Sequence, residues 1–309
     1  MNFTTKLNDL QEKIIDLKQK KNAVILAHFY QTMDIQVIAD FVGDSLDLSK
    51  RAKNASENLI LFCGVKFMAE SAKLLSPHKK VLIPNTNAGC PMSDMVTPEI
   101  VRNLREENPK AKVVCYVNSS AETKAECDIC CTSSNAVNIV KNIDSDEIIF
   151  VPDKNLGAYV AKFVPKKKFI YMKGWCPVHK NITAEETIAK KREFPNAKFA
   201  VHPECEPDVV ELADFIGSTL QILDYCTKSR DLEFIIGTEY GVVERLRYYC
   251  PEKKYHILSP TLVCPNMKKT TLDDIYNCLA NESGENIVEL SEDIIDKANM
   301  PLEKMLMMG

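Results

Sequence analysis

A Cys-Pro dipeptide that returns at a nearly constant interval is the feature that most constrains how this chain can fold. Cys90, Cys176 and Cys264 lie 86 and 88 residues apart, and each is followed by proline and, seven residues after the cysteine, by threonine. Self-similarity at a fixed interval is typical of repeated structural units. Three units that close around an axis would bring one thiolate from each to a common point, so these cysteines are candidate ligands of a single metal centre.

The sequence between the cysteines follows the same interval. Each unit opens with an apolar run, and the three runs occupy residues 23–31, 112–120 and 198–206. Their alignment assigns one equivalent position to His28, Tyr116 and His202. It assigns a second position, two residues later, to Tyr30, Asn118 and Glu204. Because side chains alternate along a strand, both sets are predicted to lie on one face of their strands.

Later in each unit, a hydroxyl residue marks the start of a helical stretch. These residues are Ser45, Ser133 and Thr219. Such a hydroxyl can cap the helix, or it can join the unpaired N–H groups of the first turn in binding a carboxylate or phosphate. Two further strands follow in each unit. The closing helices are expected to begin at Thr97, Thr183 and Thr271, each with acids in its first turn.

Strands that alternate with helices predict parallel sheets, because parallel strands need crossover connections. The fold class is therefore expected to be α/β, with three homologous three-layer α/β/α sandwich domains with parallel sheets around a pseudo-three-fold axis. We expect the domains at residues 1–108, including an N-terminal helix, at 109–194, and at 195–309, including a C-terminal helix. The two terminal helices are expected to lie together on the outside.

Composition narrows the setting in which the chain works. It has no run of about 18 apolar residues and no N-terminal apolar segment of the signal-peptide kind, which argues against membrane spanning and secretion. The 12 cysteines do not form the framework of a small secreted protein, so a cytoplasmic location is expected. A net charge of −4 with mixed signs gives no footprint for nucleic acid.

Three remote cysteines favour an iron–sulfur cluster over structural zinc. Structural zinc takes four protein ligands, usually from local CxxC pairs, whereas a cluster of four irons held by three thiolates leaves one iron open. An open iron is a Lewis acid that can bind a substrate oxygen and help to expel it as water. The alternative is that each cysteine is a small buried apolar residue, and the threefold repetition disfavours it.

The remaining cysteines do not recur between the units. Cys127 and Cys130 form a CxxC, but no second CxxC stands at zinc-ribbon spacing and the context is not that of thioredoxin. We interpret this pair as a chance occurrence, and we expect Cys131 in the turn that leads to the helix of Ser133.

In these motifs the chain resembles the quinolinate synthase family, whose members make quinolinate for NAD biosynthesis. The resemblance runs from about residue 22 to residue 280 and has motifs in every unit. They include AHFYQ, GDSLDLSKRA, NAGCPMSDM, YVNSSAETKAECDICCTSSNAV, GWCPVH, VHPECEP and GTEYGVVERL. The family folds as three α/β domains around a pseudo-three-fold axis and holds a 4Fe-4S cluster by one cysteine from each domain.

The resemblance implies a reaction and its partners. Iminoaspartate would condense with dihydroxyacetone phosphate to give quinolinate, phosphate and water. An aspartate-oxidising enzyme would supply iminoaspartate, and neither nucleic acid nor membrane would be a partner. One 4Fe-4S cluster per chain, with an open iron as Lewis acid, would be held by Cys90, Cys176 and Cys264.

The resemblance also implies which residues bind and which react. Substrate and product would be bound by His28, Ser45, Tyr116, Asn118, Ser133, His202, Glu204 and Thr219. Tyr30 and His179 match residues with catalytic or positioning roles in the family. Tyr30 and Glu204, which are equivalent in the repeat, would form an acid–base pair for the proton transfers.

Two alternatives remain open. A different cluster-dependent hydro-lyase could use the same open iron on another hydroxy acid, and analysis of the products would separate the two enzymes. A non-catalytic cluster protein, such as a redox or oxygen sensor, would need neither an open iron nor a polar ring around it. A dicarboxylate that changes the iron spectrum would therefore favour an enzyme.

Overall fold

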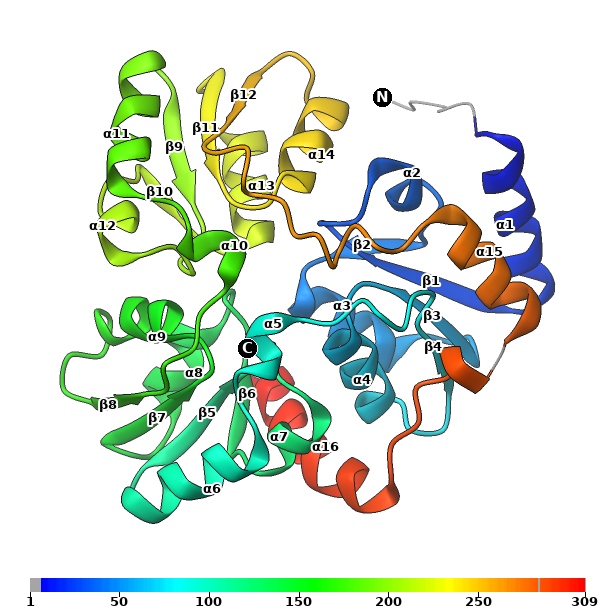
Figure 1. Cartoon of the computed structure of the whole chain (residues 1–309), viewed down its shortest axis with the longest axis horizontal. Helices are drawn as coiled ribbons and strands as arrows, with labels where there is room; N and C mark the ends of the chain where they lie inside the picture. Colours follow the sequence, from blue (N-terminus) through cyan, green and yellow to red (C-terminus); the bar gives the residue numbers. More distant parts are fainter. Residues whose placement is uncertain (1–6, 283, 309) are drawn as a thin grey trace.

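Three parallel sheets surround a common centre in the computed structural model (Figure 1), which describes residues 7–282 and 284–308. The first sheet has the strand order β2 (Phe41–Gly43), β1 (Ala23–His28), β3 (Leu59–Cys63) and β4 (Lys80–Leu82). The second has the order β6 (Ile129–Cys131), β5 (Lys112–Tyr116), β7 (Glu147–Val151) and β8 (Lys168–Tyr171). The third has the order β10 (Phe215–Ile216), β9 (Lys198–Val201), β11 (Glu233–Gly237) and β12 (Lys254–Ile257).

Both faces of the sheets are covered, because neighbouring residues of the central strands belong to different hydrophobic cores. In β1, Val24 packs in one core and Ile25 in another. In β11, Phe234 and Ile235 are divided in the same way. Strands buried on both faces are continuous apolar runs, as these are. The expected α/β class with three-layer domains and parallel sheets is confirmed, whereas a pseudo-three-fold axis and the domain boundaries stay predictions.

The helices follow the chain through the three units. The first unit contains α1 (Asp9–Lys20), α2 (Met33–Gln36), α3 (Ser45–Asn54), α4 (Lys66–Leu75), α5 (Pro91–Asp94) and α6 (Pro98–Glu107). The second contains α7 (Ala121–Ala125), α8 (Ala136–Asn142), α9 (Lys154–Ala161), α10 (Pro177–Lys180) and α11 (Ala184–Glu193). The third contains α12 (Pro207–Val210), α13 (Thr219–Lys228) and α14 (Gly241–Tyr249). The chain ends with α15 (Leu272–Asn281), the 3₁₀ turn η1 (Gly284–Asn286) and α16 (Glu292–Met308).

One short strand in each unit was missed by the sequence analysis. These strands, β2, β6 and β10, have two or three residues and each pairs in parallel with the first strand of its unit. A segment this short carries no usable periodicity. Cys131 is the last residue of β6, so its expected position in a turn was wrong.

The closing helices α6, α11 and α15, whose N-caps are Thr97, Thr183 and Thr271, each pack on another unit. Arg105 of α6 pairs with Asp128 of the second unit at 2.7 Å, and Lys191 of α11 donates to the carbonyl of Leu212 in the third unit at 2.6 Å. Helix α15 packs on the first sheet, where Ile275 shares a core with Ile25. Through these three contacts between neighbouring units, the units form a closed ring (Figure 1).

The two terminal helices lie apart, which corrects the expectation that they lie together. Helix α1 packs against α15, whereas α16 packs against α7 and β6 of the second unit and against α4 of the first (Figure 1). Ala298, Leu302 and Met305 of α16 are fully buried in these contacts. Residues 1–6 and 309 of the expected termini lie outside the described residues. Among the described helices, none is both long and apolar enough to cross a membrane.

Candidate active site

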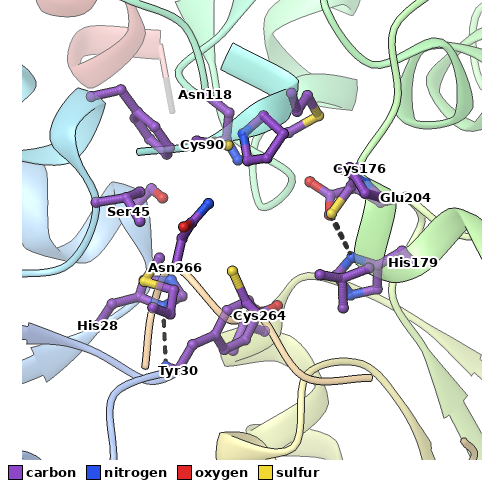
Figure 2. A pocket seen from close by; sticks show the side chains of 18 of the residues that line it. His28, Tyr30, Ser45, Cys90, Asn118, Cys176, His179, Glu204, Cys264 and Asn266 are labelled. Carbon is purple, nitrogen blue, oxygen red and sulfur yellow. Dashed lines mark hydrogen bonds and ion pairs between the residues drawn. The ribbon is translucent and has the colours of Figure 1, made fainter. Parts of the chain in front are cut away.

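The carboxyl ends of the first strands in all three sheets open onto one cavity of about 150 Å³ (Figure 2). In open parallel sheets, this end is where ligands bind. Every residue that the sequence analysis assigned to the site lines this cavity. The full set is His28, Tyr30, Ser45, Cys90, Tyr116, Asn118, Ser133, Cys176, His179, His202, Glu204, Thr219 and Cys264.

The three repeated cysteines lie at the wall of this cavity, and Figure 2 shows their sulfurs turned towards it. Cys90 and Cys176 stand at the N-caps of α5 and α10, where the following proline begins the helix. Burial raises the pKa of all three thiols, that of Cys90 to about 12. The protein alone therefore disfavours the thiolates, and a cationic metal group would supply the missing charge. Three convergent thiols beside polar groups fit an iron–sulfur cluster in their donor chemistry.

Two of these cysteines are held in place by buried acidic side chains that the sequence analysis missed, and burial raises the pKa of both acids. Asp153 accepts hydrogen bonds from the backbone N–H groups of Cys176 at 3.1 Å and Leu156 at 2.7 Å. Glu239 accepts from the N–H groups of Cys264 at 3.1 Å and Gly241 at 2.7 Å. Both side chains are fully buried. The repeat could have revealed them, because they lie 86 residues apart, at equivalent positions.

His179 connects a candidate ligand to a candidate base. Its Nδ1 lies 2.8 Å from Oε2 of Glu204 and 3.2 Å from Sγ of Cys176. One oxygen, one nitrogen and one sulfur of this trio all lie within 4.8 Å of one another. Burial alone would raise the pKa of Glu204, but His202 and His179 lower it below its ordinary value. Glu204 is therefore an ionised acceptor beside the candidate metal ligands.

A hydrogen-bonded chain joins Tyr30 to Glu204 across the three units. The hydroxyl of Thr238 lies 2.9 Å from the Tyr30 phenol and 3.0 Å from Nε2 of His179, whose other nitrogen contacts Glu204. Thr219 contacts the same phenol at 3.0 Å. Burial, followed by the charge of Glu204, holds the pKa of Tyr30 well above its ordinary value. Tyr30 is therefore a neutral proton donor.

The two equivalent histidines share one local pattern. Nδ1 of His28 accepts from the N–H of Tyr30 at 3.1 Å, and Nδ1 of His202 accepts from the N–H of Glu204 at 3.3 Å. In the neutral ring this leaves the proton on Nε2. Burial lowers the pKa of His28 to about 3 and that of His202 to about 4, so both rings are neutral. Nε2 of His202 lies 3.2 Å from the Ser133 hydroxyl.

The structure corrects the predicted position of the second set of equivalent residues, Tyr30, Asn118 and Glu204, which were expected on a strand face. Strands β1, β5 and β9 end at His28, Tyr116 and Val201. Tyr30, Asn118 and Glu204 therefore lie in the turns after the strands, so their predicted placement on a strand face was wrong. The amide oxygen of Asn118 is buried without a hydrogen-bond partner among the described residues. Such an unpaired acceptor in a cavity wall is suited to a donor on a ligand.

The three hydroxyl residues are not the caps of their helices. Asp44 caps α3, accepting from the N–H groups of Leu46 and Asp47, and Ser218 caps α13. Ser45 and Thr219 are the first residues of these helices, and Ser133 lies two residues before the N-cap of α8. The capping interpretation of these hydroxyls was therefore wrong.

Asp44 also connects the three units. Its Oδ2 accepts from the hydroxyl of Ser134 at 2.7 Å and from that of Ser218 at 3.5 Å. Asp44 lines the cavity and was missed, because the equivalent residues of the other two units, Thr132 and Ser218, are not acids. Asn266, two residues after Cys264, is a further polar residue of the wall that was missed (Figure 2).

Comparison with known proteins extends over all three units. A family model described as "Quinolinate synthetase A protein" matches residues 12–307. A quinolinate synthase of Caldicellulosiruptor bescii is 53% identical over 300 residues, which cover 97% of this chain and 98% of the relative. One of Alkaliphilus metalliredigens is 50% identical over 306 residues, 99% of each chain. One of Clostridium perfringens is 51% identical over 301 residues, 97% of this chain and 99% of the relative. The resemblance seen in the sequence is confirmed, and the chain is an enzyme that belongs to the quinolinate synthase family.

Proposed function

We propose that this enzyme condenses iminoaspartate with dihydroxyacetone phosphate to give quinolinate, phosphate and water. The observation that carries the proposal is the meeting of the three repeated cysteines with a ring of polar side chains in one cavity. Family membership and the names of the relatives support the product. The free cysteines of the chain support a reducing, cytoplasmic location. We also propose domain boundaries near residues 108 and 194.

Cys90, Cys176 and Cys264 would hold one 4Fe-4S cluster. When bound, such a cluster supplies an open iron that acts as a Lewis acid and favours the loss of a substrate hydroxyl as water. The donor set supports this assignment, because the three thiols come from three units and leave the fourth corner of the cluster without a cysteine.

The polar residues of the cavity would bind the two substrates. The neutral rings of His28 and His202 present N–H donors, and the hydroxyls of Ser45, Ser133 and Thr219 add further donors. Ser45 and Thr219 stand in the first turns of α3 and α13, whose positive ends favour carboxylate or phosphate. The unpaired oxygen of Asn118 would accept from an amine or hydroxyl.

Proton transfer would use the chain from Tyr30 to Glu204. The phenol can donate to Thr238, whose hydroxyl donates to Nε2 of His179, whose Nδ1–H donates to Glu204. All donors then point from Tyr30 towards Glu204. When the phenol oxygen takes a proton from substrate, its own proton can pass along the chain and protonate Glu204, which can return one proton to a departing hydroxyl. Such positioned acid–base groups typically contribute about 100-fold or more to the rate.

Replacement of each candidate ligand tests the proposal. Anaerobically purified Cys90→Ala, Cys176→Ala and Cys264→Ala are each expected to lose both the iron and sulfide of the cluster and the formation of quinolinate. Cys130→Ala is the matched control, because Cys130 is buried outside the cavity, and it should keep both. Loss of iron in Cys130→Ala together with full iron in Cys176→Ala would disprove the ligand assignment.

The proton chain has its own test. Thr238→Val removes the hydroxyl between Tyr30 and His179 while keeping the shape of the side chain. We expect kcat to fall roughly 100-fold with iron content unchanged. Thr227→Val is the control, because among the described residues the Thr227 hydroxyl bonds only to the backbone carbonyls of Leu223 and Asp224 in its own helix. An unchanged kcat in Thr238→Val would rule out this route.

A further inference from the structure

The turn that carries Tyr30 is bonded to side chains through its carbonyl groups. Nε2 of Gln36 donates to the carbonyl of Phe29 at 3.0 Å and to that of Gln31 at 2.8 Å. The carbonyl of Tyr30 accepts from Nζ of Lys268 at 2.6 Å. Peptide groups away from water need such partners. For Tyr30 the partner comes from the third unit, 238 positions later in the sequence.

Lys268 also makes an ion pair that leads to a candidate cluster ligand. Its Nζ lies 3.2 Å from Oε1 of Glu239, in a pair largely shielded from solvent. The same oxygen accepts from the backbone N–H of Cys264 at 3.1 Å, and Oε2 accepts from the N–H of Gly241 at 2.7 Å. Because donors engage both oxygens, Glu239 is suited to be a carboxylate paired with an ammonium. Three contacts in series therefore join the N–H of Cys264 to the carbonyl of Tyr30.

The same turn is closely packed on the third unit. A Cβ atom at Gly241 would lie 2.7 Å from the carbonyl oxygen of Phe29 and 3.1 Å from Cα of Tyr30. Nε2 of Gln31 donates to the carbonyl of Met267, the residue before the lysine, at 2.7 Å. The third unit therefore fixes the position of a turn that belongs to the first.

The repeat shows that this lysine contact is specific to the third unit. The residues four positions after the three cysteines are Asp94, Lys180 and Lys268. Asp94 has the opposite charge. Nζ of Lys180 lies 3.7 Å from the centre of the Trp175 ring, and it forms no ion pair with a carboxylate in the described part of the chain. Lys180 is therefore a matched control for Lys268.

We propose that Lys268 is a positioning residue that holds the turn of Tyr30 in a fixed place relative to the segment of Cys264. The phenol that begins the proton chain then keeps its place in the cavity that the cysteine also lines (Figure 2). The side chain of Lys268 does not line this cavity, so it acts through Tyr30 and not on the substrate. A displacement of about 1 Å in a reacting group can cost roughly 100-fold in rate. The inference rests on the proposed function for the role of Tyr30.

Two kinds of measurement on the anaerobically purified full-length protein test the proposal. Steady-state kinetics give kcat and KM for quinolinate formation, and iron analysis gives the cluster content of each variant. The fluorine NMR spectrum of protein that carries 3-fluorotyrosine at residue 30 alone reports the surroundings of the phenol. The spectrum needs no turnover.

Lys268→Met removes the ammonium and keeps the length of the side chain. We expect kcat to fall at least tenfold with KM unchanged for both substrates, and the fluorine resonance to shift or broaden. Iron content should be unchanged, because Glu239 remains as the acceptor for the N–H of Cys264. Lys268→Arg, which keeps a cation with several donors, should restore most of kcat and return the resonance. Lys180→Met should leave kcat, iron and resonance unchanged.

A second variant covers the case in which Lys268→Met does not fold. Removing one partner of a shielded ion pair is more destabilising than removing both. The double variant Lys268→Met with Glu239→Gln removes the charge pair together and still lacks the contact with the carbonyl of Tyr30. It should move the fluorine resonance in the same way as the single variant.

Several results would overturn the proposal. An unchanged fluorine resonance in Lys268→Met would show that the lysine does not fix Tyr30. A higher KM with unchanged kcat would make Lys268 a substrate-binding residue, and loss of iron with unchanged kcat per cluster would make it a support of Cys264 only. If the unchanged protein formed no quinolinate, the proposed function would fail, yet the resonance would still show whether Lys268 holds the turn. The two failures are therefore distinguishable.

Discussion

The first unit supports its cysteine differently from the other two. In the second and third units a buried carboxylate, Asp153 or Glu239, binds the backbone N–H of the cysteine. The equivalent residue of the first unit is Val65, which cannot accept a hydrogen bond. The first unit instead places its carboxylate at Asp44, beside the hydroxyls, where the others have Thr132 and Ser218. Equivalent candidate ligands therefore do not require equivalent supports, and Cys90 lacks the acidic side chain that holds Cys176 and Cys264.

The largest expected effect comes from removing a support. Asp153→Leu leaves the N–H groups of Leu156 and Cys176 unpaired in the interior, which should lower the free energy of unfolding by about 3 kcal/mol. Iron content after anaerobic purification should fall below half. Urea unfolding and iron analysis measure the two effects.

Val65→Ala is the matched control in the first unit. It removes two methyl groups and no hydrogen bond, so it should cost only about 1–2 kcal/mol and keep the iron. Equal iron loss in both variants would mean that the carboxylate has no special role.

A smaller effect on stability is expected from the two buried histidines, His28 and His202, which occupy equivalent positions in the first and third units. The pKa of His28 is lowered to about 3 and that of His202 to about 4 in the folded chain, while both rings titrate near pH 6.5 when unfolded. The unfolded chain therefore binds more protons between pH 6.5 and 4, so stability falls as the pH is lowered through this range. Each histidine should account for about 2 kcal/mol at pH 5.

Unfolding at a series of pH values measures this effect. The slope of the unfolding free energy against pH reports how many more protons the unfolded chain binds. His28→Gln and His202→Gln should each reduce this number by about one between pH 6.5 and 4. His78→Gln, at an exposed turn outside the cavity, is the control for the substitution itself. If only one of the two buried histidines contributed, the likeness of the first and third units would be limited to geometry.

The smallest effect is expected at Asp44. Asp44→Ala removes the cap of α3 and the acceptor of Ser134, which should lower the free energy of unfolding by about 1 kcal/mol. Ser134→Ala, which loses only the contact between units, should cost less. A larger loss in Ser134→Ala than in Asp44→Ala would show that the cap is unimportant here. Thermal unfolding of the two variants gives the comparison.

The repeat predicted the site well because it acts at long range. Cys90 and Cys264 are 174 residues apart, and only their shared interval indicated that they meet. Local rules were less successful. The strand period placed Tyr30 and Glu204 on strands, but the strands end before them and turns carry both side chains into the cavity. Helix-start rules selected Ser45, but its neighbour Asp44 made the cap.

Contacts between dissimilar residues were beyond the sequence analysis. Thr238 joins Tyr30 to His179 through a single hydroxyl, and no spacing rule relates these three residues. The pairing of Cys115 with Cys130 depends on two strands, one of which is only three residues long. Asp153 and Glu239 could have been found from the interval, but a carboxylate near a strand end has no distinctive motif.

The packing of each closing helix on another unit has a consequence for the stability of the individual units. Because α15 packs with α1 on the core beneath the first sheet, a fragment that ends at Cys264 would lose part of the cover of Ile25 and Leu61, although both belong to the opposite end of the sequence. Each unit therefore depends on a helix from another unit for part of its packing. The three units should therefore unfold on heating in a single transition rather than one after another.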